Sequence, residues 1–122
     1  MKLFLIALGG GLGSVLRYLT QIMIERYTTL SFPFGTFTIN IIGCLLIGLF
    51  SGYFLNQNQP SDALKFFLIT GLCGGYTTLS TFSVENMALL QENKFLPFLL
   101  YVAGSVIIGL IATYLGFKIT AN

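Results

Sequence analysis

The stretch GLCGGYTTLSTF, residues 71–82, decides the fold expected for this chain. It lies in the apolar segment 64–90, yet it holds three glycines and four serine or threonine residues. Glycine lowers helix stability by about 1 kcal/mol relative to alanine, so the adjacent Gly74 and Gly75 predict a broken helix. Backbone groups freed by a break must line a cavity or bind an ion, because lipid offers them no partner. Alternatively, Gly71 and Gly75 only allow close helix packing, as small residues four apart often do.

The composition is that of a membrane protein. Only 8% of the 122 residues are charged and the mean hydropathy is +0.86, whereas soluble domains carry about 25% charged residues. A helix that crosses a bilayer needs about 20 mostly apolar residues. The chain therefore predicts an all-α integral membrane protein with a single transmembrane domain over residues 1–122. Its four expected spans cover residues 3–24, 34–55, 64–90 (broken near 74–76) and 96–117.

Several function classes are excluded by what the sequence lacks. A net charge of +2, scattered along the chain, is too small to indicate nucleic-acid binding. There is no histidine and no Cys-x-x-Cys motif, so Cys44 and Cys73 predict buried, inert thiols rather than a zinc site. The sequence also holds no general base, nucleophile pair or metal cluster, and we expect no enzyme activity.

Three polar side chains stand inside or near the ends of the apolar spans. Arg17 lies toward one interface, where it either extends to the lipid headgroups or guards a wet vestibule that attracts anions. Asn40 is costly in hydrocarbon without a partner, so it either bonds a neighbouring helix or faces an ion path. Glu85 falls toward the same membrane side as Arg17, which leaves a pairing between the two open.

The basic residues that flank the spans are evenly divided between the two sides. Four spans place both termini and loop 56–63 on one side of the membrane. That side carries Lys2, Lys65 and Lys118, and the other carries Arg17, Arg26 and Lys94. The positive-inside rule then favours neither orientation. We expect the chain to insert both ways and to form an antiparallel, dual-topology dimer, since four short helices are too few to enclose a solvated path.

Three motifs in order resemble the Fluc (CrcB) family of fluoride channels. They are a glycine-rich first span that ends at Arg17 and Tyr18, GTFTINIIG at 35–43, and GGYTTLSTF at 74–82. The resemblance covers essentially all four spans. It implies a fluoride-selective channel that exports fluoride from the microbial cytoplasm by passive electrodiffusion and so protects against fluoride toxicity. It also implies an antiparallel homodimer in the plasma membrane, with two pores and one central structural sodium ion.

The resemblance also assigns roles to single residues. The backbone carbonyls of Gly74 and Thr77 match the family's sodium ligands, and Asn40 matches its pore asparagine. Phe82 matches one of the family's two pore phenylalanines. The family's hydroxyl track and its span-four pair match Ser80, Thr81, Tyr101 and Ser105. A selective pore must replace the tightly held water of fluoride with hydrogen-bond donors, and Thr78 offers one more.

One position departs from the family pattern. Leu79 stands where the family usually has the first of its two phenylalanines. An aromatic edge is electropositive and can favour an anion, whereas a leucine side chain only fills space. The departure puts the conduction rate in doubt, unless a non-identical partner chain supplies the missing ring.

Two other functions compete with the channel. A small drug/proton antiporter is also a four-span, dual-topology dimer, but its chemistry needs a carboxylate near the middle of a span, and Glu85 is off-centre. An inert structural or regulatory membrane subunit would explain neither the break nor the polar stripes. Fluoride efflux from liposomes separates the three functions.

Overall fold

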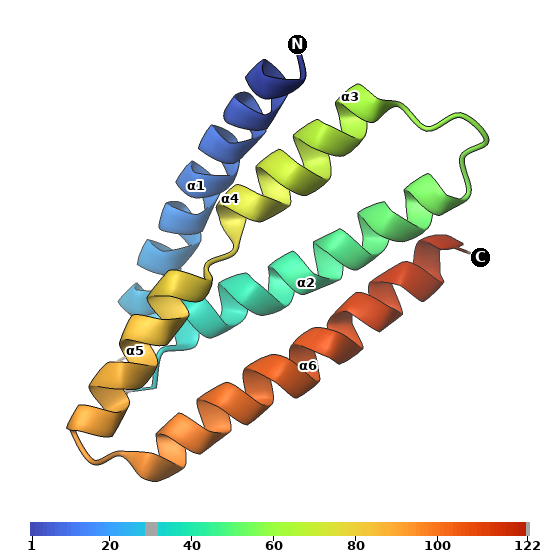
Figure 1. Ribbon diagram of the computed structural model, residues 1–122. Coiled ribbons are helices and arrows are strands. Elements are labelled where there is room, and N and C mark those ends of the chain that lie inside the picture. Colours follow the sequence, from blue (N-terminus) through green and yellow to red (C-terminus); the bar gives the residue numbers. More distant parts are fainter. Residues whose placement is uncertain (29–31, 122) are drawn as a thin grey trace.

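In the computed structural model, which describes residues 1–28 and 32–121, these residues form helices and connecting loops without a strand (Figure 1). The helices in chain order are α1 (Lys2–Tyr27), α2 (Phe34–Leu55), α3 (Asp62–Lys65), η1 (Phe66–Cys73), α4 (Gly74–Tyr76), α5 (Leu79–Gln91) and α6 (Phe95–Ala121). The all-α class predicted from the sequence is therefore confirmed.

Three helices, α1, α2 and α6, are each long and apolar enough to cross a membrane. They correspond to the first, second and fourth predicted spans. The third predicted span is present in two pieces, because α3, η1 and α4 follow one another directly and α5 begins only after an interruption. The chain is therefore a multi-pass membrane protein in which the third of four spans is broken.

The helices form two close pairs, which Figure 1 shows side by side. α2 lies along α6, and α1 lies along the piece made by α3, η1 and α4. Glycines allow both approaches: a β-carbon at Gly48 of α2 would overlap the backbone of Thr113 in α6. Likewise, a β-carbon at Gly13 of α1 would lie 2.8 Å from the backbone nitrogen of Tyr76. Both pairs are therefore in backbone-to-backbone contact.

The break lies one residue beyond the predicted range 74–76. Gly74 and Gly75 are still helical, and the chain leaves the helix at Thr77 (φ −84°, ψ 160°) and Thr78 (φ −150°, ψ 120°). Local propensity favoured the glycine pair as the weak point. The position of the break is instead set by contacts with α1 and α2, described below, which keep the glycines helical and the threonines extended.

Glycines before the break serve packing. A β-carbon at Gly75 would overlap the backbone of Gly10 in α1, and one at Gly71 would lie 3.0 Å from the Cα of Gly9. None of the described glycines has a positive φ, so space rather than backbone conformation requires them. The interpretation of Gly71 and Gly75 as close-packing residues is confirmed, and it holds together with the break.

The eight residues of η1 form a π-helix, which is wider than an α-helix. The hydropathy pattern predicts a helix here but not its wider form. π-Helical turns are rare and are frequent at functional sites. This one packs against α1 and leads directly into α4 and the break.

Candidate functional site

Asn40 of α2 holds the break through both ends of its amide. Its Oδ1 accepts a hydrogen bond from the N–H of Thr78 at 2.9 Å, and its Nδ2 donates to the carbonyl of Thr78 at 3.1 Å. An extended residue between two helices lacks helical partners for these groups, and Asn40 supplies both. The interpretation of Asn40 as a bond to a neighbouring helix is therefore confirmed. An amide nitrogen carries two hydrogens, so a second one remains for an ion path.

The carbonyls of Gly74 and Thr77 have lost their usual helical partners. In a continuous α-helix they would accept from the N–H groups four residues on, those of Thr78 and Thr81. The Thr78 N–H goes to Asn40 instead, and the Thr81 N–H goes to the Thr78 hydroxyl, which caps α5 at 3.2 Å. Both carbonyl oxygens thus need another partner, and carbonyls of this kind are what cations bind at broken membrane helices.

Thr77 turns its side chain back onto the preceding helix. Its hydroxyl donates to the carbonyl of Cys73 at 2.9 Å, and its N–H donates to the same carbonyl at 3.1 Å. Only the carbonyl of Thr77 is therefore left for the predicted sodium site. Thr77 and the exposed Gly74 line a mostly apolar surface hollow of about 400 Å³, the break hollow. Its other walls include Asn40, Gly43, Cys44, Ile47, Cys73 and Leu79.

The predicted hydroxyl track of α5 lies on the outside of the single chain. Ser80 and Thr81 are exposed, and Leu79 is 75% exposed. Polar groups beside a helix break do not face lipid. The role of Ser80 and Thr81 in an ion path stays a prediction.

Phe82 and Tyr101 are brought together at the contact of α5 with α6. Their ring centroids are 4.8 Å apart and tilted by 56°. Phe32 and Phe37 also lie against the Tyr101 ring, at 5.4 Å and 6.5 Å. Tyr101 is 0% exposed, whereas Phe82 is half-buried and keeps part of its ring open to the surroundings.

Glu85 binds hydroxyl groups from two other helices. Tyr101 of α6 donates to its Oε1 at 2.8 Å, and Thr36 of α2 donates to its Oε2 at 3.0 Å. This bridge joins α2, α5 and α6 and occupies the Tyr101 hydroxyl that the resemblance gives to fluoride. Thr36 was not among the predicted site residues, although it lies four residues before Asn40 and so on the same face of α2.

Arg17 does not pair with Glu85, so the pairing left open above does not form. Across residues 1–28 and 32–121, the only ion pair joins Glu92 and Lys94. Arg17 instead lines a hollow of about 310 Å³, the basic hollow. Its other walls are Ser14, Tyr18, Gln21, Thr36, Thr78 and Thr81. A guanidinium surrounded by hydroxyl and amide groups suits the anion vestibule, which stays a prediction.

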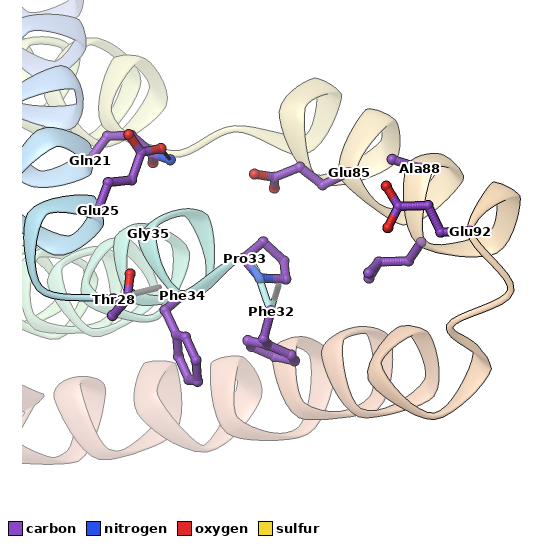
Figure 2. Close-up of a pocket in the computed structure, with 11 residues that line it drawn as sticks. Gln21, Glu25, Thr28, Phe32, Pro33, Phe34, Gly35, Glu85, Ala88 and Glu92 are labelled. Carbon is purple, nitrogen blue, oxygen red and sulfur yellow. Dashed lines mark hydrogen bonds between the residues drawn. The ribbon is translucent and has the colours of Figure 1, made fainter. Parts of the chain in front are cut away.

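A third hollow, of about 290 Å³, is lined by carboxylates and is called here the acidic hollow. Figure 2 shows Glu85 of α5 and Glu92, the residue just after α5, facing Gln21 and Glu25 of α1 across it. Gln21 donates to Glu25 at 2.7 Å and lines both this hollow and the basic hollow. Like charges repel, so an anion is favoured in the basic hollow and disfavoured in the acidic one.

Two buried side-chain polar atoms have no hydrogen-bond partner in the described part of the chain, Ser105 Oγ and Asn86 Oδ1. An unpaired buried polar atom costs about 1–3 kcal/mol. The hydroxyl of Ser105, a predicted pore residue, is a donor without an acceptor, which suits an anion path. Asn86 was not predicted, and its only signal in the sequence is an amide within an apolar span.

Comparisons with known proteins identify relatives of this chain. The family model described as "CrcB-like protein, Camphor Resistance (CrcB)" matches residues 4–117. The fluoride-specific ion channel FluC of Flavobacterium psychrophilum is 62% identical over 114 residues, which cover 93% of this chain and 92% of that protein. FluC of Phocaeicola vulgatus is 49% identical over 116 residues, which cover 94% of each chain.

A fluoride-specific channel FluC 2 of Rhodococcus jostii is 46% identical over 121 residues, which cover 99% of this chain and 100% of that protein. Family model and relatives thus extend over nearly the whole chain and include the break, the glycine-rich first span and α6. They confirm the resemblance drawn from the three motifs. The chain therefore belongs to the CrcB family of fluoride channels, which are not enzymes.

Proposed function

We propose that this protein is a fluoride-selective channel through which fluoride leaves the cytoplasm across the plasma membrane by passive electrodiffusion, which protects the cell against fluoride toxicity. The observation that carries the proposal is the 62% identity to a fluoride-specific channel over 93% of the chain. The geometry supports it, because polar groups from α2, α5 and α6 meet beside a broken membrane helix. Polar groups in such places mark ion pathways more often than packing.

The donors proposed for fluoride are the ones that the fold leaves unused. Ser105 Oγ is buried and unpaired within the described residues, and Asn40 keeps one amide hydrogen after its two bonds to Thr78. The hydroxyls of Thr78 and Ser80 lie 3.4 Å apart, so either can turn toward an ion. A fluoride ion that loses its water needs several such donors at once.

The assembly proposed is an antiparallel homodimer with two pores. Exposed Ser80 and Thr81, next to backbone carbonyls without helical partners, cannot be left facing lipid. A second copy of the chain covers them with polar groups of the same kind. The even division of basic residues supports two opposite orientations.

A structural sodium ion between the two copies is also part of the proposal. The carbonyls of Gly74 and Thr77 fit it, because their helical partners are bound by Asn40 and by the Thr78 hydroxyl. They also lie at the C-terminal end of α4, where aligned peptide dipoles favour a cation. When bound, the ion would supply a positive charge that joins the break of one copy to the break of the other.

Fluoride efflux from liposomes that contain the purified protein tests the function. A fluoride electrode should record release once an ionophore balances the charge, and matched liposomes loaded with chloride should release none. A drug/proton antiporter would show proton-driven drug uptake without fluoride release, and an inert subunit would show neither. Absence of fluoride release from folded, reconstituted protein contradicts the proposal.

Labelling from the two membrane faces tests the dual topology. A cysteine that replaces the exposed Gln57 in loop 56–63 should react partly with an impermeant thiol reagent from each side, with Cys44 and Cys73 changed to serine. Complete labelling from one side would refute dual topology and would favour a pair of non-identical subunits.

A further inference from the structure

One turn of α2 contacts both residues of the break. The side-chain amide of Asn40 binds the backbone of Thr78 through two hydrogen bonds. Three residues on, and so on the same face, Gly43 is buried against Thr77. A β-carbon at Gly43 would overlap the Cγ2 methyl of Thr77 and would lie 3.8 Å from Cδ2 of Tyr76. Gly43 therefore forms a notch that receives the Thr77 methyl.

The notch and a pair of hydrogen bonds together hold the Thr77 side chain. The hydroxyl and the backbone N–H of Thr77 both donate to the carbonyl of Cys73, at 2.9 Å and 3.1 Å. With the hydroxyl on one side and the methyl in the notch on the other, only one side-chain rotamer fits. Because Gly43 does not have a positive φ, the glycine is there for the space it leaves.

We propose that Gly43 is a positioning residue for the ion pathway: its notch seats the Thr77 methyl and holds the break in its extended conformation. This inference rests on the proposed channel function. A larger residue at position 43 displaces Thr77 and with it the Thr77 carbonyl. The displacement also reaches Thr78, whose hydroxyl caps α5. A shift of this cap moves the start of α5, where Ser80 lies.

The proposal predicts that the effect of Gly43→Ala reverses sign with the residue at position 77. In the parent chain, the added methyl collides with Thr77, and fluoride flux per folded protein should fall roughly tenfold. Thr77→Ser keeps the hydroxyl for Cys73 but empties the notch, so it should lower flux by itself. In the Thr77→Ser chain, Gly43→Ala fills that space, and flux should rise severalfold over the serine variant alone.

Two matched controls isolate the notch. Gly11→Ala adds a methyl where no heavy atom lies within 4 Å, so flux and stability should stay at the parent level. Gly48→Ala collides with the backbone of Thr113 in α6, more than one helical turn along α2 from Gly43 and against a different helix. It should destabilise the protein, and Thr77→Ser should not correct that loss.

Four proteins are compared: the parent, Gly43→Ala, Thr77→Ser and the double variant. The measurements are fluoride efflux, fluoride-over-chloride selectivity and thermal unfolding in detergent. Packing alone would lower the unfolding temperature of Gly43→Ala and leave flux per folded protein and selectivity unchanged, which contradicts the proposal. Gly43→Ala effects of the same sign in both backgrounds also overturn it. If Gly43→Ala does not fold, the proposal requires that the double variant with Thr77→Ser folds and conducts fluoride. If the parent conducts no fluoride, the proposed function fails, while the unfolding temperatures still test the notch.

Discussion

The two sides of the break in the third span use different residues for different purposes. Before the break, glycines bring η1 and α4 into backbone contact with α1, and Gly75 leaves no room for a side chain. After the break, α5 has no glycine and contacts other helices through hydrogen bonds, such as those of Glu85 to Tyr101 and Thr36. The first side is a closely packed support, and the second carries the side chains of α5 that are proposed for the fluoride path.

The largest effect is expected from a side chain on the closely packed side. Gly75→Ala places a β-carbon into the backbone of Gly10, which cannot move aside as a side chain can. The free energy of unfolding should fall by about 3 kcal/mol, the upper end for overpacking. Denaturant unfolding in detergent measures it, with Gly11→Ala as the control. Equal stability of parent and Gly75→Ala would mean that the contact with α1 is not tight.

Removal of the amide that joins α2 to the break should have the next largest effect. Asn40→Ala loses two hydrogen bonds to Thr78 and a donor for fluoride. A bond to a charged group contributes about 1.5–3 kcal/mol, and flux should fall roughly tenfold to hundredfold if that bond forms mainly at the barrier. Thr120→Val removes a remote interhelical bond, to the carbonyl of Leu49, and should cost stability only. Parent-level flux in folded Asn40→Ala would mean that conduction needs neither the two bonds to Thr78 nor a fluoride donor at position 40.

Phe82→Ile tests whether the side after the break faces the ion. If the ring edge lines the path, flux should fall about tenfold while the protein stays folded. If the ring only packs on Tyr101, stability should drop by about 1–3 kcal/mol and flux per folded protein should hold. Phe37→Ile makes the same change of shape on another ring beside Tyr101 and serves as the control. Both readouts come from liposome efflux and thermal unfolding of the same samples.

The smallest effect is expected at the family's missing aromatic. Leu79 is 75% exposed in the single chain, so Leu79→Phe should not change the packing of this chain. It restores the usual phenylalanine pair, and flux should hold or rise by up to about threefold. Selectivity over chloride should not change. A clear loss of flux would show that the leucine is needed where the resemblance implies a ring.

Much of the fold could be predicted because hydropathy and span length are local properties. The position of the break could not, although its existence could. Propensity pointed to Gly74 and Gly75, but α1 needs Gly75 for contact, and the Thr78 backbone is bound by an amide 38 residues away. The roles of the site residues stay predictions, and the sequence did not give their hydrogen-bond partners, such as Glu85 for Tyr101 and for Thr36.

The sequence by itself determined an all-α, multi-pass membrane protein of the CrcB family with a broken third span, since apolar length, glycine spacing and short motifs are properties of neighbouring residues. Only the tertiary structure decided that Asn40 binds the break, that Gly43 makes room for Thr77, and that Glu85 bonds Tyr101 and Thr36 instead of Arg17. These contacts join residues far apart in the chain. They depend on how each helix is rotated about its axis, and no local pattern determines that rotation.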